Sequence, residues 1–357
     1  MPSRRGSRGS GADTVRGSDG MSRRGRDEAI DETHVASRSD VGRVRVVNED
    51  SCGSYLLSDG ARLLVVADGM GGHRGGATAS REALAAIAAV FEESTSSPVD
   101  ASDLRDPHAT LRQAIERANA RVHAMSLEDP ELAGMGTTVV AFLLDATGRG
   151  VVAHVGDSRA YRHRGGRLEA LTTDHSVVAE MLKRGVLTAE EAAYHPRRNE
   201  ILRSVGVLPE VEVEVAAVDV RAGDRILLCS DGLCGVVSDA EIDEILAETE
   251  LGAGEDAVER LVELANECGG PDNVTVELLA ISPGWRSGTR ARSAVGPGVV
   301  FARETEMGAS STANGMGAGA AVGSRSADGA GRSALPLALI ALLIAAAYSA
   351  YRIWRSG

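Results

Sequence analysis

Residues 62–69 read RLLVVADG and residues 224–232 read DRILLCSDG, and these two stretches decide how the rest of the chain is interpreted. Each is an apolar run with the length of a buried strand, and each ends in Asp–Gly, at Asp68 and at Asp231. A single Asp–Gly at the end of a strand is most often only a turn. The same ending on two buried runs instead favours carboxylates that share a functional site.

Further acidic residues stand at the boundaries of other apolar runs. Asp157 lies in VVAHVGDSRAYR, Asp272 opens the run in GGPDNVTVELLAI, and RVVNEDS contains both Glu49 and Asp50. If these boundaries meet at one edge of a common sandwich, the carboxylates repel one another unless cations neutralise them. Oxygen ligands without paired His or Cys select Mg²⁺ or Mn²⁺ over zinc.

A carboxylate cluster of this kind predicts the hydrolysis of a phosphate ester. Two hard cations about 3.5–4 Å apart can bridge a water, lower its pKa and stabilise the attacking and leaving oxygens. The reaction also needs a cation for the non-transferred oxygens, and Arg45, close before Glu49, can hold them bidentately. Without this context, Arg45 would be interpreted as half of a surface salt bridge.

The glycine-rich stretch DGMGGHRGG, residues 68–76, is a poor candidate for a nucleotide site. It contains neither G-x-G-x-x-G nor G-x-x-x-x-G-K-[ST]. Small residues here instead allow the backbone carbonyl of Gly69 to approach a cation and the next helix to begin nearby. The Gly69 carbonyl is therefore a candidate metal ligand.

Turn residues and apolar periodicity predict the fold class. Asp59–Gly60 favours a β-hairpin, and glycine turns near residues 148–150 and 165–166 favour further antiparallel strands. Apolar stripes predict helices around residues 84–91 and 111–125, and a capping box at Ser238 begins a later helical pair. We therefore expect an α+β protein, a four-layer α/β/β/α sandwich of two mainly antiparallel sheets flanked by helices.

Composition excludes several classes of protein. The formal charge of −13, from 51 acidic and 38 basic residues, argues against a nucleic-acid partner. Four cysteines are too few for a disulfide scaffold, and none forms a Cys-x-x-Cys zinc motif. Nothing repeats at a fixed period, so a structural repeat protein is also excluded. These observations favour a soluble-type enzyme domain, expected to be monomeric and to work in a reducing compartment.

The chain is predicted to contain one globular domain, at residues 36–282, between segments of lower complexity. Residues 1–35 are rich in Gly, Ser and Arg and are expected to be disordered, with Met21 an alternative start. Within the domain, residues 176–206 are predicted to form a flap insertion with a capping box at Thr188. Residues 283–333 resemble a flexible linker.

The C-terminal segment predicts a membrane anchor. Residues 334–351 are apolar and uncharged, long enough for a borderline transmembrane helix, and 352–357 form a short tail with Arg352 and Arg355. Because no signal sequence precedes the domain, we expect a catalytic domain in the cytoplasm, attached to the membrane. The alternative is an Ala-rich terminal helix on a soluble cytoplasmic protein.

The ordered motifs between Val41 and Ile281 resemble a known family. They are RVVNEDS, VVADGMGGHRGG, GMGTTVV, VGDSRAYR, DHS, HPRRNEILRSVG, LLCSDGL and GPDNVTV. In this order they are similar to the bacterial type of protein phosphatase 2C (PP2C, PPM). The resemblance implies an enzyme that removes phosphate from phosphoserine and phosphothreonine on proteins with two Mn²⁺ or Mg²⁺ ions, opposing serine/threonine kinases.

The resemblance also implies roles for single residues. Asp68 would bridge both metals, Asp231 and Asp272 would complete one, and Glu49 and the Gly69 carbonyl would complete the other. Asp157 and Asp231 would hold a third metal, as in bacterial members of the family. Arg45 would bind the substrate phosphate. Asp50 is expected to act through water.

The sequence departs from many eukaryotic members at one position. Those proteins have a histidine after the Asp–Gly, proposed as the general acid, where this chain has Met70. His73 and His175 are the nearby candidates for that role, against the ordinary interpretation of a loop histidine as structural. Two other functions stay open at this point: a regulatory PPM-like module that binds phosphoproteins without hydrolysis, and a hydrolase of small phosphate esters.

Overall fold

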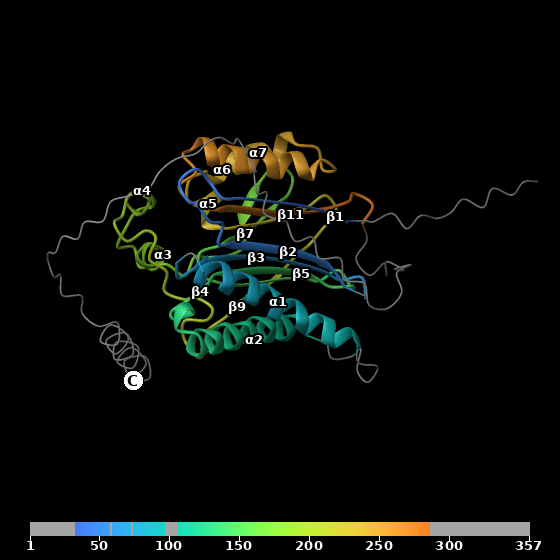
Figure 1. Cartoon of the computed structure of the whole chain (residues 1–357). Coiled ribbons are helices and arrows are strands. Elements are labelled where there is room, and N and C mark those ends of the chain that lie inside the picture. Colours follow the sequence, from blue (N-terminus) through green and yellow to red (C-terminus); the bar gives the residue numbers. More distant parts are fainter. Residues whose placement is uncertain (1–32, 58, 73, 97–105, 286–357) are drawn as a thin grey trace, which may run out of the picture. The chain divides into compact units, whose positions relative to one another are not determined.

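The computed structural model describes residues 33–285, apart from residues 58, 73 and 97–105, and builds them around two antiparallel sheets (Figure 1). Sheet 1 has the strand order β1 (Thr33–Asp40), β11 (Val274–Ile281), β10 (Arg225–Cys229), β7 (Arg159–His163) and β8 (Leu168–Ala170). Sheet 2 has the order β2 (Asp50–Leu56), β3 (Arg62–Met70), β5 (Val139–Leu144), β6 (Gly150–Val155) and β9 (Glu214–Val218). A short strand, β4 (Gly136–Thr137), pairs with β3.

The two sheets face each other across an apolar layer. Strands β3, β5, β10 and β11 are buried along nearly their whole length because each sheet has one face on this layer and one under helices. The layer between the sheets contains Leu64, Val66, Phe142, Ile226, Leu228 and Leu279. The two-residue repeat of a strand therefore sends Leu64 and Val66 to one core and Val65 to the other.

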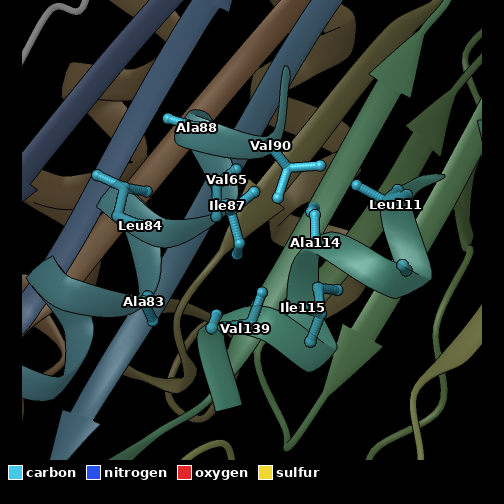
Figure 2. Close-up of a cluster of buried hydrophobic side chains, with 14 of the residues drawn as sticks. Val65, Ala83, Leu84, Ile87, Ala88, Val90, Leu111, Ala114, Ile115 and Val139 are labelled. Carbon is cyan, nitrogen blue, oxygen red and sulfur yellow. The ribbon is translucent and has the colours of Figure 1, made fainter. Parts of the chain in front are cut away.

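Helices α1 (Gly75–Ser96) and α2 (Pro107–Glu128) cover the outer face of sheet 2. Figure 2 shows their apolar side chains over the sheet, with Ile87 and Ile115 above Val65 and Val139. These are the two helices that the apolar stripes predicted, and η2 (Pro130–Leu132) follows the second. The stripes are confirmed because helical spacing aligns them on one face.

Helices α5 (Asp231–Cys234), α6 (Asp239–Glu248) and α7 (Gly254–Glu267) cover the outer face of sheet 1. The predicted capping box at the start of α6 is present, since Ser238 and Glu241 each accept from the other's backbone. The four layers of the predicted α/β/β/α sandwich are thus confirmed, with α1 and α2 on one side and α5–α7 on the other (Figure 1).

The insertion predicted at residues 176–206 contains two short helices, α3 (Val177–Lys183) and α4 (Ala189–Ala193). The capping box at Thr188 is also present. The insertion is closed at its base by an isolated bridge between Ser176 and Ile201. Several of its apolar side chains are exposed, Tyr194 most of all.

The ordered domain begins earlier than the apolar pattern indicated. Strand β1 starts at Thr33 and pairs with β11 over its whole length, so the prediction of disorder is wrong for residues 33–35. No helix within the described part of the chain is long and apolar enough to cross a membrane. The predicted anchor at 334–351 lies outside the described residues, as do residues 1–32 and most of the predicted linker.

Candidate active site

The strand ends singled out by the sequence meet at one edge of the sandwich. Asp50 and Asp68 are direct partners in the β2–β3 register of sheet 2. Asp231 begins α5 directly after β10 of sheet 1, and Ser230 before it donates from Oγ to Asp50 Oδ2 at 2.8 Å. This bond joins the two sheets at the point where their carboxylates converge.

The proximity of these carboxylates changes their proton affinity. Burial, and after it the charges of Asp50 and Asp231, raises the pKa of Asp68 well above its ordinary value. Burial and the Asp272 charge likewise raise the pKa of Asp231. The pKa of both carboxyl groups is raised, so Asp68 and Asp231 tend to keep protons that isolated aspartates lose at neutral pH.

Asp50 and Asp157 extend this group, which we call the carboxylate cluster (Asp50, Asp68, Asp157, Asp231 and Asp272). Burial raises the pKa of Asp50 to about 7, against the lowering effect of hydrogen bonds from Thr275 and Ser230. Burial and the charge of Asp231 raise the pKa of Asp157 to about 7. All five carboxyl groups of the cluster are thus linked electrostatically, since the charge of Asp272 also acts on Asp50 and Asp231.

Several oxygens at this edge have no partner. Among the described residues, Glu49 Oε1, Asp50 Oδ1 and Asp231 Oδ1 are buried and accept no hydrogen bond. A buried carboxylate oxygen without a donor is costly, and the cost is larger beside like charges. Oxygen atoms with these properties fit a hard divalent cation, which would replace the retained protons and satisfy the free oxygens.

Close backbone packing explains the glycines of the motif. A Cβ on Gly69 would lie 2.2 Å from Gly76 O and 2.5 Å from Glu49 O. A Cβ on Gly76 would lie 2.5 Å from Glu49 Oε1. Because Gly69 and Gly76 have no side chain, Glu49 has room to lie against the first turn of α1. The N–H groups of that turn favour a negative charge.

Arg45 lies beside the carboxylate cluster, as predicted. Its Nη2 donates to Asp272 Oδ2 at 2.7 Å, and its Nη1 lies 3.8 Å from Glu49 Oε2. The side chain is 46% exposed, so the guanidinium can be reached from solvent while these carboxylates orient it. This arrangement suits a cation that exchanges a carboxylate for a phosphate oxygen.

The structure adds Asn273, to which the sequence interpretation gave no role. Its Oδ1 accepts from Glu49 N at 2.8 Å, and its Nδ2 donates to Val41 O and Val47 O at 2.9 and 3.0 Å. Asn273 therefore fixes the loop that presents Arg45 and Glu49. The motif GPDNVTV contained this residue, but only the three-dimensional structure shows the amide reaching back to that loop.

Asp174 is a second residue without a predicted role. It binds Arg159 through two bonds of 2.8 Å, and its charge contributes to the raised pKa of Asp157. Thr138 also supports the site, since its Oγ1 accepts from Asp68 N at 3.1 Å and lies 2.7 Å from Ser158 Oγ. These polar side chains fix the backbone on which the carboxylates stand.

His175 does not have the properties of a general acid. It is buried, and burial together with the neighbouring His154 lowers its pKa to about 4, so it is neutral at pH 7. Its Nδ1 accepts from Gly156 N at 3.2 Å, which leaves Nε2 as a donor to Glu214 Oε2 at 3.3 Å. His73, the other candidate, lies outside the described residues.

His154, His175 and Glu214 form a separate group whose ligand atoms all lie within 4.8 Å of one another. The imidazole rings stack at 4.4 Å between centroids, and His154 Nε2 is 2.9 Å from Thr173 O. Arg203 Nη1 lies 3.4 Å from His175 Nε2, where a bound cation would have to compete with it. We interpret this group as a structural contact at the base of the insertion.

A group of buried carboxyl groups whose oxygens lack partners in the described part of the chain, with an accessible arginine beside it, indicates a metal-dependent enzyme acting on phosphate esters. Residues 43–266 match the family model described as Protein phosphatase 2C, and the chain belongs to that family.

Two similar proteins are named serine/threonine phosphatases, and each matches 69% of this chain. The serine/threonine phosphatase stp of Listeria monocytogenes is 39% identical over 246 residues, covering 69% of this chain and 95% of that protein. The serine/threonine protein phosphatase PstP of Mycobacterium tuberculosis is 43% identical over 246 residues, covering 69% of this chain and 44% of that protein. The chain is therefore a metal-dependent serine/threonine protein phosphatase, and the alternative of a regulatory binding module finds no support.

Solved structures give the same result for the fold. A Streptococcus agalactiae serine/threonine phosphatase matches with a TM-score of 0.64 and 34% identity, covering 70% of this chain and all of that one. The catalytic domain of PstP in complex with two manganese ions matches with a TM-score of 0.60 and 40% identity, covering 70% and 98%.

Proposed function

We propose that this enzyme hydrolyses phosphoserine and phosphothreonine on proteins at a centre of two Mn²⁺ or Mg²⁺ ions held by the carboxylate cluster. Asp68, Asp231 and Asp272 of this cluster would hold the two ions together with Glu49 and the Gly69 carbonyl. The observation that carries the proposal is the set of buried carboxylate oxygens without a partner among the described residues, on Glu49, Asp50 and Asp231, beside the Asp50–Asp68 pair. Relatives that the chain resembles include a phosphatase bound to two manganese ions.

A third, weaker ion is proposed between Asp157 and Asp231. The charge of Asp231 raises the proton affinity of Asp157, as the second cause of its raised pKa after burial. Asp157 stands on the turn after β6, held by His175 through Gly156.

Bound cations would supply a Lewis acid and a water of lowered pKa. The residues of the chain supply the remaining requirements. Arg45 leaves Asp272 to bind the non-transferred phosphate oxygens, and Ser230 holds Asp50 with one carboxylate oxygen free for a water. Asp50, whose pKa is raised to about 7, is suited to hold a proton at neutral pH.

The test is hydrolysis of a phosphothreonine peptide by the full-length chain with Mn²⁺, with a chelator, and in the variant Asp231→Asn. We expect activity only with metal, and a loss of about a thousandfold or more in the variant, since a ligand to both the catalytic and the third ion is altered. Asp256→Asn, an exposed carboxylate on α7, is the control. Metal-independent turnover, or full activity in Asp231→Asn, would overturn the proposed centre.

The substrate is proposed to be a phosphoprotein modified by a serine/threonine kinase. Profiling a phosphothreonine peptide against p-nitrophenyl phosphate separates this from a hydrolase of small esters. A kcat/KM that favours the peptide supports the proposal. A preference for the small ester would instead favour the second function considered above.

We further propose that residues 334–351 attach the enzyme to the membrane with its catalytic domain in the cytoplasm. The support is the apolar, uncharged composition of this segment. Expression with and without residues 334–357 should shift the protein from the membrane fraction to the soluble fraction. Full-length protein that is soluble without detergent would exclude the anchor.

A further inference from the structure

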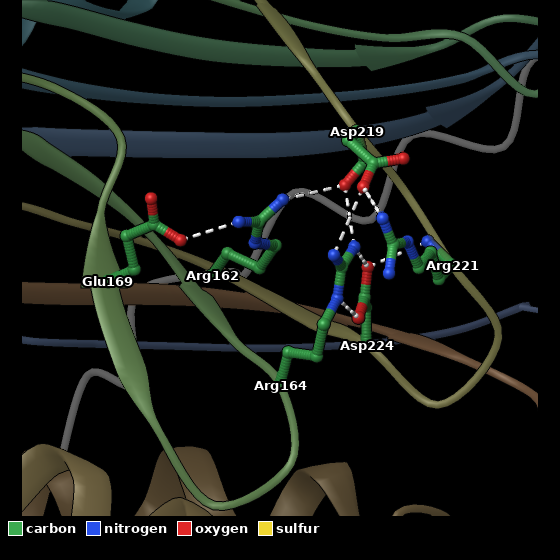
Figure 3. Close-up of polar contacts among 6 residues, drawn as sticks. All are labelled: Arg162, Arg164, Glu169, Asp219, Arg221 and Asp224. Carbon is green, nitrogen blue, oxygen red and sulfur yellow. Dashed lines mark hydrogen bonds and ion pairs between the residues drawn. The ribbon is translucent and has the colours of Figure 1, made fainter.

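A second charged cluster lies at the opposite end of β10 from the carboxylate cluster (Figure 3). Asp224 precedes this strand and Asp231 follows it, so the two ends are about 20 Å apart at roughly 3.3 Å per residue. Here a cavity of about 200 Å³ is lined by four residues of the β7–β8 hairpin. They are Arg162, Arg164, Arg167 and Glu169, and we call this feature the arginine cavity.

Two of these arginines are fixed from behind by other residues. Arg164 donates to both oxygens of Asp224 at 2.6 Å, and the Asp224 side chain is fully buried. Arg162 donates from Nη1 to Asp219 O at 2.8 Å and from Nη2 to Glu169 Oε2 at 2.5 Å. Both guanidinium groups are therefore oriented before any ligand arrives, and less side-chain entropy is lost on binding.

The wall of the arginine cavity carries more positive than negative charge. Three arginines and one glutamate line it, whereas Asp219 and Asp224 hold the arginines from outside the lining. Arg167 is exposed, and within the described part of the chain its side chain makes no ion pair or hydrogen bond.

An ion-pair network that only joins the β9–β10 turn to the β7–β8 hairpin would need Arg164 and Asp224. It would need neither the cavity nor the unpaired guanidinium of Arg167. The volume also limits the ligand, because sites for drug-sized molecules begin at about 300 Å³. A small anion fits this space, and the tetrahedral oxygens of phosphate match the fork of donors that guanidinium presents.

We propose that the arginine cavity binds a phosphate group, as a second site separate from the catalytic edge. The distance along β10 prevents one phosphate from reaching both places. The ligand is therefore either free inorganic phosphate, which the enzyme itself releases, or a second phosphorylated side chain on a protein. The proposal does not depend on the assignment of the metal ligands, because it uses none of those residues.

Inorganic phosphate is titrated into the full-length enzyme in the presence of a chelator, and the heat of binding is measured by calorimetry. The chelator removes metal that could hold phosphate at the catalytic edge, where Asp272 and Glu49 already lie against the guanidinium of Arg45. We expect saturable binding in the millimolar range, weakened at least tenfold in Arg167→Gln, since charge-assisted hydrogen bonds contribute about 1.5–3 kcal/mol and tenfold is 1.4 kcal/mol. Arg81→Gln, which removes an exposed arginine on α1, should bind like the unmodified protein.

Arg167→Gln should fold normally because its side chain has no partner among residues 33–285, and an unchanged thermal midpoint would verify this. Equal binding by this variant and the unmodified chain, or no saturable binding by the unmodified chain, would overturn the proposal. A phosphothreonine peptide that competes with phosphate identifies a phosphorylated side chain as a ligand. Binding of phosphate without such competition identifies the free anion.

Discussion

The two ends of strand β10 carry clusters of aspartates in opposite electrostatic surroundings. At the Asp224 end, arginines compensate each carboxylate, and hydrogen bonds from Arg164 and Arg221 lower the pKa of Asp219. At the Asp231 end, aspartates face one another, and the pKa of Asp50 and of Asp157 rises to about 7. Aspartates therefore stabilise the fold at the Asp224 end of β10, whereas at the Asp231 end they favour the binding of cations.

This difference separates structural from catalytic carboxylates without reference to the family. A paired, hydrogen-bonded aspartate has its charge satisfied within the chain. An aspartate whose pKa is raised by burial and by neighbouring carboxylates keeps its proton until a cation binds and replaces it. Substitutions at the two ends should consequently affect different measurements, and the following predictions are ordered by the size of the expected effect.

The largest effect is expected for Asp68→Asn at the catalytic end. We expect kcat on a phosphothreonine peptide to fall by about a thousandfold or more, roughly 4 kcal/mol in activation free energy, because a bridging ligand is lost. The thermal midpoint of the metal-free protein should stay equal or rise, because one of several repelling carboxyl groups is removed. A variant that lost stability but retained activity would reverse the roles assigned to the two clusters.

Asp224→Ala, at the other end of β10, should lower the stability of the fold and retain the activity. It removes the two carboxylate oxygens that accept from Arg164 Nε and Nη2, and leaves Asp219 as the remaining acidic partner of that guanidinium. We expect a loss of about 3 kcal/mol in the free energy of unfolding by urea, at the low end for a broken buried pair since Arg164 is 27% exposed. Asp219→Ala, on an exposed side chain, is the control and should have little effect.

The sequence predicted the carboxylate cluster at the Asp231 end of β10 better than the arginine pairs at the Asp224 end. Each catalytic aspartate follows or opens an apolar run, so strand periodicity alone brings Asp68 and Asp231 to a common edge. The pairing of Arg164 with Asp224 joins residues 60 apart in the sequence, and charge pattern does not specify such partners. Strand β1 was missed because THVASRSD has no apolar run, as an edge strand bonded only to β11 does not require one.

The pH dependence of the metal-free protein should also distinguish the two ends. The folded-state pKa of Asp50 and Asp157 is about 7, whereas an unfolded aspartate titrates near 3.8. Between these values the folded state binds more protons, so stability falls as the pH rises from about 4 to 7. We expect the thermal midpoint of the metal-free protein to fall over this pH range, and Mn²⁺ to restore it at pH 7.5.

Asp68→Asn should flatten this pH dependence, and Asp219→Ala should leave it unchanged. A thermal midpoint of the chelated protein that rises between pH 5 and pH 7.5 would contradict the raised pKa values. Heating scans with and without Mn²⁺ at each pH are sufficient to decide the question.

Arg45 offers the smallest and most specific test, because it is an arginine placed among the catalytic carboxylates. Unlike Arg164, it is 46% exposed, and its bond of 2.7 Å to Asp272 is accessible to solvent. Exposed ion pairs stabilise proteins little, so Arg45→Ala should leave the unfolding free energy within about 1 kcal/mol. Loss of its contact with phosphate should raise KM for the phosphopeptide about tenfold, the value of one charge-assisted hydrogen bond.

The matched control is Arg74→Ala, which removes an exposed arginine paired with Glu131 and should leave KM unchanged. If Arg45→Ala destabilises the fold as strongly as Asp224→Ala, then Arg45 neutralises carboxylates in the way that Arg164 does. It would then be a structural partner of Asp272, and the substrate phosphate would need a different cation. An increase in KM without loss of stability instead shows that Arg45 is oriented by carboxylates but available to the substrate.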